Sequence, residues 1–247
     1  MIRRYGWRPD KPDHRDLICD LKAKKGAPKN IDLRKTGHLP PVYDQGQTGS
    51  CTGNGIAGAV EYGLRAQGKA DYIPSRLFIY YNERVIENTT DQDAGAEIRD
   101  GIKVVASLGA PNEDVWPFDP NQLTTRPSDA AYAEAKKHII KQYSRVPVKL
   151  ANIVNVLSHN IPIVFGATLY RSFESDAVAQ TGVVPMPSNT ETVVGGHCML
   201  IVGSEGSNFI VRNSWGEGWG DRGYCYIPHD YLTNEHLADD FWAIFLS

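Results

Sequence analysis

The stretch QGQTGSCTGNGIAGAVEYGL, residues 45–64, is a glycine-rich loop that ends at a cysteine and continues into an apolar repeat. Apolar residues at positions 56, 60 and 64 recur every four residues, which predicts one buried face of a helix. Cys51 therefore lies at a predicted helix N-terminus, where backbone N–H groups and the helix dipole favour a thiolate. Gln45 lies upstream on the same loop, and its side-chain amide can donate a hydrogen bond to an oxyanion.

A nucleophilic cysteine needs a base and an orienting group, and the C-terminal third of the chain offers both. His197 opens the apolar run 197–203, and Asn213 closes the next predicted strand. A hairpin through residues 204–207 would place these strands side by side and bring Asn213 near His197. Taken alone, Cys51 is equally well interpreted as a small buried apolar residue. The partnership with His197 and Asn213 favours the nucleophile.

Four separate motifs follow one another along the chain. They are QGQTGSC at residues 45–51, GGH at 195–197, NSWGEGWG at 213–220 and GYCYI at 223–227. Together they resemble the papain family of cysteine proteases, which includes the cathepsins. The resemblance covers roughly residues 39–247, and the NSWGEGWG motif is highly specific.

The resemblance implies an α+β fold with two lobes and an active-site cleft between them. We expect residues 39–142 to form a helical lobe and residues 143–247 to form an antiparallel, β-barrel-like lobe. The C-terminal residues of the second lobe can cross back to the helical lobe. Residues 1–38 form a separate arm. Near the boundary between the lobes, Ser128 is expected to cap a helix that runs through Tyr143.

Catalytic roles are implied at four positions that match the family's motifs. Cys51 would be the nucleophile, and His197 would be the general base and acid. Asn213 would orient the imidazole of His197. Gln45 would supply one donor of the oxyanion hole.

Substrate-binding roles are implied at four further positions. Trp215 would shield the histidine–asparagine hydrogen bond and line the leaving-group side of the cleft. Gly95 and Gly196 would lie along the substrate backbone, although Ala94 stands where a second glycine is usual before Gly95. Asp239 falls roughly where the family sets the floor of the P2 pocket, so arginine at P2 is one expectation. The alternative is that Asp239 is simply exposed.

The chain departs from the cathepsin B pattern in a way that bears on its activity. Gly195 and Gly196 before His197 resemble that enzyme, yet residues 85–127 contain no pair of histidines from which an occluding loop could be built. We therefore expect a cathepsin-like endopeptidase of bacterial type. Two alternatives stay open, namely an acyltransferase or deamidase that uses the same triad, and a binding protein without catalysis.

Composition narrows the choice of partners. The 247 residues carry 26 basic and 29 acidic side chains, for a net charge of −3. This balance gives no electrostatic reason to expect nucleic acid or an anionic membrane. No Cys/His cluster has the spacing of a metal site, so we expect neither a metal nor another cofactor. Peptides or proteins are the expected substrates, and a monomer is the expected state.

The N-terminal arm, residues 1–38, reads as an extended segment that Tyr5 and Trp7 anchor to the body. It contains no apolar stretch typical of a secretory signal, and the compartment stays open. One interpretation is a short pro-segment that covers the cleft. The other is a structural extension that merely packs along the body.

Overall fold

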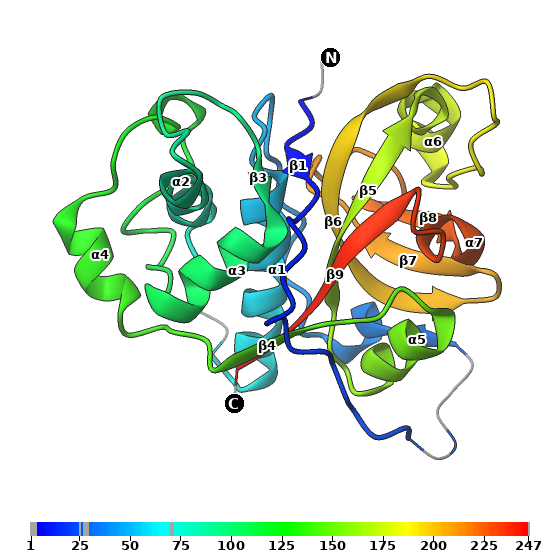
Figure 1. The fold of residues 1–247 in the computed structure, drawn as a ribbon, viewed down its shortest axis with the longest axis horizontal. Coiled ribbons are helices and arrows are strands. Elements are labelled where there is room, and N and C mark those ends of the chain that lie inside the picture. The colour runs from blue at the N-terminus through cyan, green and yellow to red at the C-terminus, as the bar shows by residue number, and fades with distance from the viewer. Residues whose placement is uncertain (1–3, 25, 27–29, 70–71, 247) are drawn as a thin grey trace.

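The protein has helices on one side and an antiparallel sheet on the other, with the N-terminal arm running between them (Figure 1). The computed structural model describes residues 4–24, 26, 30–69 and 72–246. This α+β architecture agrees with the fold class predicted from the motifs. No helix within the described ranges is both long and apolar enough to cross a membrane.

The helical side is centred on α1, which is buried along most of its length. Small residues allow neighbours to approach α1 closely: a β-carbon at Gly53 would lie 2.7 Å from the backbone of α2, and one at Gly55 would lie 2.9 Å from the sulfur of Cys198. The elements of this side are α1 (Cys51–Ala66), α2 (Arg76–Glu87), β3 (Ala96–Glu97), α3 (Ile98–Ser107), the short 3-10 helix η2 (Pro120–Gln122) and α4 (Asp129–Ala135).

The other side is a seven-stranded sheet in the order β4-β9-β5-β6-β7-β8, with β2 also paired to β6. Neighbouring strands run antiparallel, and they form no closed barrel in the part of the chain described. Its strands are β2 (Ile31–Asp32), β4 (Gln142–Arg145), β5 (Ile163–Tyr170), β6 (Val193–Glu205), β7 (Asn208–Arg212), β8 (Tyr224–Pro228) and β9 (Ala238–Phe245). The associated helices are α5 (Leu150–Ser158), η3 (Arg171–Glu174), α6 (Asp176–Thr181) and α7 (His229–Leu232).

The hairpin predicted through residues 204–207 is confirmed. Strands β6 and β7 pair antiparallel, with Leu200 opposite Arg212 and Glu205 opposite Asn208. His197 lies earlier on β6, and Asn213 directly follows β7. The hairpin therefore carries both residues to the same end of the sheet.

The helix predicted from Ser128 through Tyr143 is wrong in its length. Ser128 does cap α4, because its hydroxyl accepts a hydrogen bond from the backbone N–H of Ala131, but the helix ends at Ala135. Tyr143 instead lies on β4, opposite Ile244 of β9. Pairing with a strand a hundred residues away overrides the local helical pattern.

The N-terminal arm adds strands to both halves of the molecule. Strand β1 (Trp7–Arg8) pairs parallel with β3, so the arm enters between the helices and the sheet. Farther along, Ile18 bridges to Arg145 on β4. The arm then supplies β2 and the short 3-10 helix η1 (Leu33–Thr36) along the sheet side.

The core of the sheet side gives a stability prediction. Phe165 on β5 is fully buried, and its ring packs 5.3 Å from that of Phe241 on β9. We expect Phe165→Ala to lower the free energy of unfolding by about 3–5 kcal/mol, because it leaves a cavity between the two strands. Urea denaturation measures this loss. Val183→Ala, at an exposed residue, should change it by less than about 0.5 kcal/mol; similar losses in both variants would contradict the placement of this core.

Candidate active site

The fold places Cys51 at the first position of α1, with Ser50 as the residue before the helix. The loop that leads into α1 is closed by local hydrogen bonds: Thr48 Oγ1 donates to the carbonyl of Gln45 at 2.8 Å and lies 2.7 Å from Ser50 Oγ. The backbone N–H of Gly49 donates to the carboxylate of Asp93. These contacts fix the position of the thiol at the helix N-terminus.

The thiol of Cys51 is completely buried, and part of its cover comes from the N-terminal arm. Backbone N–H groups of Cys198 and Gly6 face its sulfur and favour the thiolate. Burial nevertheless outweighs them and raises the pKa of Cys51 to about 11. Contrary to the expectation for a cysteine at a helix N-terminus, the pKa of Cys51 is therefore not lowered, because water is excluded from the sulfur.

His197 and Asn213 form a buried pair. The Nε2 atom of His197 lies 2.8 Å from Oδ1 of Asn213, and an amide oxygen only accepts, so Nε2 carries the hydrogen. The Asn213 oxygen is itself held by the backbone N–H of Ser214 at 2.8 Å. Trp215 covers the pair, with its ring centre 5.0 Å from that of His197. Cys198, whose N–H faces Cys51, is the next residue of the same strand.

Gln45 is buried and held at both ends of its amide. Its Nε2 donates to the carbonyl of Thr48 at 2.7 Å, and its Oε1 accepts from Ser214 Oγ at 2.6 Å. Its backbone N–H donates to the carbonyl of Ser214 at 2.9 Å. The loop that contains the thiol is thereby tied to the residue that follows Asn213.

Gly95 and Gly196 both lie against the arm. The backbone N–H of Ala96 donates to the carbonyl of Gly6 at 2.7 Å, and a β-carbon at Gly95 would lie 2.2 Å from that same oxygen. A β-carbon at Gly196 would lie 2.4 Å from the carbonyl oxygen of Trp7. Only glycine at these positions allows a backbone to pass so closely.

Tyr5 covers the histidine side of the thiol. Its ring centre lies 6.0 Å from that of His197 and 6.2 Å from that of Trp215. Its hydroxyl donates to the carboxylate of Glu174. A β-carbon at Gly195 would meet the Tyr5 side chain at 2.6 Å.

Trp7 is buried on the other side of Gly6. Its indole N–H donates to Oδ2 of Asp240 at 3.0 Å. Asp239, the residue singled out in the sequence, has a half-exposed side chain that lies 3.6 Å from Arg145. The carboxylate beneath the arm therefore belongs to Asp240 rather than Asp239.

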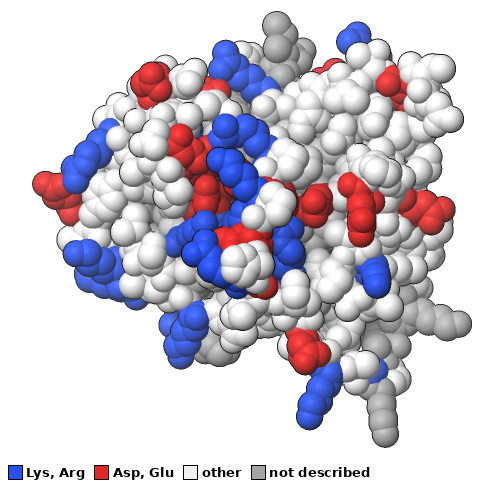
Figure 2. Space-filling view, in the orientation of Figure 1, with Lys and Arg blue, Asp and Glu red and all other residues white. Residues whose placement is uncertain are grey.

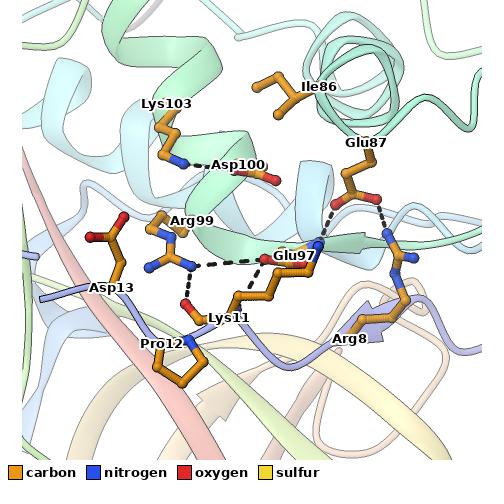
Figure 3. Close-up of a pocket in the computed structure, with 10 residues that line it drawn as sticks. All are labelled: Arg8, Lys11, Pro12, Asp13, Ile86, Glu87, Glu97, Arg99, Asp100 and Lys103. Carbon is orange, nitrogen blue, oxygen red and sulfur yellow. Dashed lines mark hydrogen bonds and ion pairs between the residues drawn. The ribbon is translucent and has the colours of Figure 1, made fainter. Parts of the chain in front are cut away.

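Charged side chains of both signs lie between the two sides of the molecule (Figure 2), and ion pairs among them fasten the same segment (Figure 3). Arg8 pairs with Glu87, whose side chain is almost fully buried. The backbone N–H of Lys11 donates to Glu97, and its carbonyl accepts from the guanidinium of Arg99. Charged side chains of both signs thus gather where the arm crosses between the two sides of the molecule in Figure 2.

Three carboxylates in this region, those of Glu87, Glu97 and Asp100, offer oxygen atoms within 4.8 Å of one another. Each is already close to a cation: Glu87 pairs with Arg8, Glu97 lies 3.9 Å from Arg99, and Asp100 pairs with Lys103 at 3.0 Å. Basic side chains thus compensate their charge, and nothing else points to a metal among them.

Comparison with known proteins identifies the family. The sequence profile of the papain family of cysteine proteases matches residues 27–241. The chain belongs to this family. It is therefore a papain-like cysteine peptidase, a hydrolase that acts on peptides or proteins.

One solved structure and two relatives show how far the similarity extends. The crystal structure of xylellain, a cysteine protease from Xylella fastidiosa, superposes with a TM-score of 0.90 at 37% identity, covering 100% of this chain and 99% of that one. An uncharacterized peptidase C1-like protein of Acanthamoeba polyphaga mimivirus is 40% identical over 99% of this chain and 87% of its own length. Mouse cathepsin K is 26% identical over 90% of this chain and 66% of its own length.

Asp10 fastens the arm to three elements, and sequence reasoning missed it. Its carboxylate accepts hydrogen bonds from the backbone N–H of Arg99 on α3 at 3.0 Å, and from Arg145 on β4 and Trp242 on β9 at 2.9 Å. Its own N–H donates to Asp240 at 2.7 Å. Burial, followed by the charge of Asp240, raises the pKa of Asp10 from 3.8 to about 7, whereas the three donors lower it.

Two more acidic residues lie near the carboxyl group of Asp10. Asp16 binds Arg99 and Arg145, and Asp239 lies beside Arg145. Burial also raises the pKa of Asp240. The sequence signal for this role of Asp10 was only the cluster of acidic residues at 10–16. That cluster is equally typical of a solvated loop.

We expect the arm to be held most tightly in acid and to loosen as the pH rises from about 4 to about 7. The docked carboxyl of Asp10 keeps its proton up to about pH 7, whereas in a released arm its pKa returns to the ordinary 3.8. The docked state therefore binds an extra proton between these values and loses that advantage as the pH rises. Hydrogen–deuterium exchange of the arm amides at about pH 5 and about pH 8, corrected for intrinsic rates, measures the change.

The control is Asp10→Asn, which cannot ionise and should show a much smaller difference between the two pH values. Equal protection of the wild-type arm at both values would contradict the assignment. So would an undiminished difference in the Asn variant.

Proposed function

We propose that this chain is a cysteine endopeptidase in which Cys51, His197 and Asn213 act as the catalytic triad and Gln45 completes the oxyanion hole. The observation that carries the endopeptidase assignment is the arm itself. It passes the thiol as a continuous chain, with Tyr5 on the histidine side and Trp7 on the other. A cleft that takes an internal stretch of chain on both sides of the sulfur suits cleavage within a polypeptide.

The chemistry follows from the proposed roles. His197 takes the proton of the Cys51 thiol, and the sulfur attacks the carbonyl carbon of the scissile peptide bond. The tetrahedral intermediate collapses as the imidazolium gives its proton to the leaving amine, which leaves a thioester on Cys51. Water then loses a proton to the imidazole and attacks the thioester, and the thiol and the new carboxyl product separate.

The hydrogen bonds of the site support this division of roles. Because Nε2 of His197 donates to Asn213, Nδ1 is the ring nitrogen left to exchange a proton with the sulfur. The backbone N–H of Cys51 and the side-chain amide of Gln45 would stabilise the oxyanion. The bonds from Gln45 to Thr48 and Ser214 hold its amide in a fixed orientation before substrate binds.

The proposed cleft lies between a helical lobe of residues 39–142 and a β-rich lobe of residues 143–247. The thiol belongs to the first and the imidazole to the second, so their meeting depends on how α1 packs on β6. Such interfaces between lobes are common places for enzyme sites.

We also propose that the docked arm inhibits the enzyme. It buries Cys51, occupies the backbone position beside Gly95 and covers His197 with Tyr5. A substrate would need the same space. Burial, to which the arm contributes, raises the pKa of the thiol to about 11, and a raised pKa lowers the fraction of reactive thiolate.

Replacing the catalytic residues tests the triad. Cys51→Ala should abolish cleavage of fluorogenic peptides, because no nucleophile remains. Gln45→Ala should lower kcat by about 10²–10³-fold, because one oxyanion donor is lost. A Gln45→Ala rate within about threefold of wild type would contradict its proposed role, and turnover by Cys51→Ala would contradict the triad.

Loosening the arm tests inhibition. Tyr5→Ala removes the contacts with His197, Trp215 and Glu174, so we expect the initial rate of peptide cleavage to rise by roughly five- to thirtyfold. Arg15→Ala is the matched control, since Arg15 is exposed and pairs with Asp13 within the arm. An unchanged rate for a folded Tyr5→Ala protein would reject inhibition by the arm.

A further inference from the structure

Asn54 lies three residues after Cys51 on α1, and its side chain is buried. Its Nδ2 donates to the carbonyl oxygen of Ser50 at 2.9 Å and to the hydroxyl oxygen of Ser50 at 3.0 Å. Its Oδ1 accepts from Nη1 of Arg76 at 3.2 Å. Asparagine is a weak helix former because its side chain competes for backbone partners, so helix formation alone does not account for a buried asparagine here.

The bond from Asn54 to the Ser50 carbonyl concerns the oxyanion hole directly. That carbonyl and the N–H of Cys51 belong to one peptide unit, and this N–H is one of the two proposed oxyanion donors. The same carbonyl accepts from the backbone N–H of Asn54 at 3.1 Å. Two donors at the oxygen hold the peptide plane in place, and hydrogen bonds in series polarise one another. The Asn54 side chain thus orients the N–H of Cys51 and strengthens it as a donor.

The bond from Asn54 to the Ser50 hydroxyl leads to the other proposed donor, Gln45. The Thr48 hydroxyl has a single hydrogen, which it donates to the carbonyl of Gln45, so it accepts in its contact with Ser50. The Ser50 hydroxyl therefore donates to Thr48 while it accepts from Asn54. These hydrogen bonds all run in one direction, from Asn54 through Ser50 and Thr48 to Gln45. The side chain of Asn54 thus supports the position of the Gln45 loop.

Arg76 determines which end of the Asn54 amide faces Ser50. A guanidinium only donates and a carbonyl only accepts, so the amide oxygen faces Arg76 and the amide nitrogen faces Ser50. Arg76 is itself held at the start of α2 by Glu113, which accepts from its Nη2 at 2.6 Å and from its Nε at 3.1 Å. Its Cζ also lies over two aromatic rings, 4.6 and 4.4 Å from their centres. The orientation of the Asn54 amide is therefore fixed from outside the loop.

We propose that Asn54 is a positioning residue of the oxyanion hole, which holds the N–H of Cys51 and the loop of Gln45 together. This rests on the proposed endopeptidase function, because the two donors have a catalytic role only in acyl transfer. Asn54 acts through Ser50 rather than on the substrate.

The first experiment compares Asn54→Ala with Asn82→Ala in the full-length chain. Asn82 is the matched control: it is a buried asparagine on α2 whose Nδ2 donates to the carbonyl four residues earlier at 2.8 Å and whose Oδ1 accepts from a tyrosine hydroxyl at 2.9 Å. Both variants should lower the urea midpoint by similar amounts. We expect only Asn54→Ala to lower kcat for fluorogenic peptides, by about tenfold or more, with KM changed by less than about threefold.

Three further measurements separate positioning from a general structural effect. Alkylation of Cys51 by iodoacetamide forms no oxyanion, so its rate in Asn54→Ala should stay within about threefold of wild type. Asn54→Ser should recover kcat by about threefold or more over Asn54→Ala, because a helical serine can donate to the carbonyl four residues earlier, that of Ser50. In a Gln45→Ala chain, Asn54→Ala should cost at least about threefold less than in wild type, because one supported donor is already absent.

Three results would overturn the proposal. Equal losses of kcat in Asn54→Ala and Asn82→Ala would show a general effect of losing a buried amide. A parallel fall in the alkylation rate would place the defect in the thiol. Losses from Asn54→Ala that are the same with and without Gln45, or no recovery in Asn54→Ser, would show that the hydrogen bonds to Ser50 do not support the two donors.

Amide hydrogen exchange tests the positioning without turnover. The amides of residues 46–51 should exchange at least about fivefold faster in Asn54→Ala than in wild type and should be unchanged in Asn82→Ala. If wild type cuts no peptide while this difference holds, the endopeptidase proposal fails and the positioning of the loop by Asn54 stands. Unchanged exchange of these amides in Asn54→Ala would overturn the positioning, whatever the peptide assay shows.

Discussion

The close packing of α1 against the sheet is the constraint on which the site depends. Gly55 and Gly58 face β6 and β7, where β-carbons would lie 2.9 Å from the sulfur of Cys198 and 2.4 Å from the guanidinium of Arg212. Because the helix has no side chains at these points, its first turn comes beside the strand that carries His197. Larger residues would push α1 outward and separate the thiol from the imidazole. Glycine is a poor helix former, so the helix relies on this packing for its stability.

The close packing of α1 on the sheet has two opposite effects on the ionisation of the Cys51 thiol. The helix N-terminus and nearby backbone N–H groups favour a thiolate, while exclusion of water favours the neutral thiol. With the arm docked, burial dominates and raises the pKa of Cys51 to about 11. The N–H of Gly6 is one of the groups that face the sulfur, so the arm both donates to it and removes its water. The arm thus acts on the sulfur in two opposite ways, through the N–H of Gly6 and through the burial that it adds.

The sequence predicts those parts of the fold and of the candidate site whose conformation depends on neighbouring residues. The loop before Cys51, the strand of His197 and the short hairpin to Asn213 depend on nearby residues, and the family motifs lie in these segments. The sequence does not predict those parts whose conformation depends on pairing with a strand distant in the chain. Tyr143 joined a strand because β9 lies alongside it, and the bulge that turns Asp240 inward arises from a register shift between two strands. Side-chain alternation read from a sequence has no means of locating such a shift.

The contacts that hold the arm are mostly polar and determine its position along the two sides of the molecule. The side chains of Asp10 and Asp240 are buried at the junction and Arg145 is partly buried beside them, so the cost of desolvating these groups offsets much of their mutual attraction. An apolar segment that buried the same area would bind this junction more strongly, and its binding would depend less on its exact position. Directional hydrogen bonds and ion pairs instead fix the register of the arm, because a shift of one residue would leave these polar groups without their partners. Trp7 and Tyr5 supply the apolar contact on either side of Gly6, and the polar contacts determine where that contact forms.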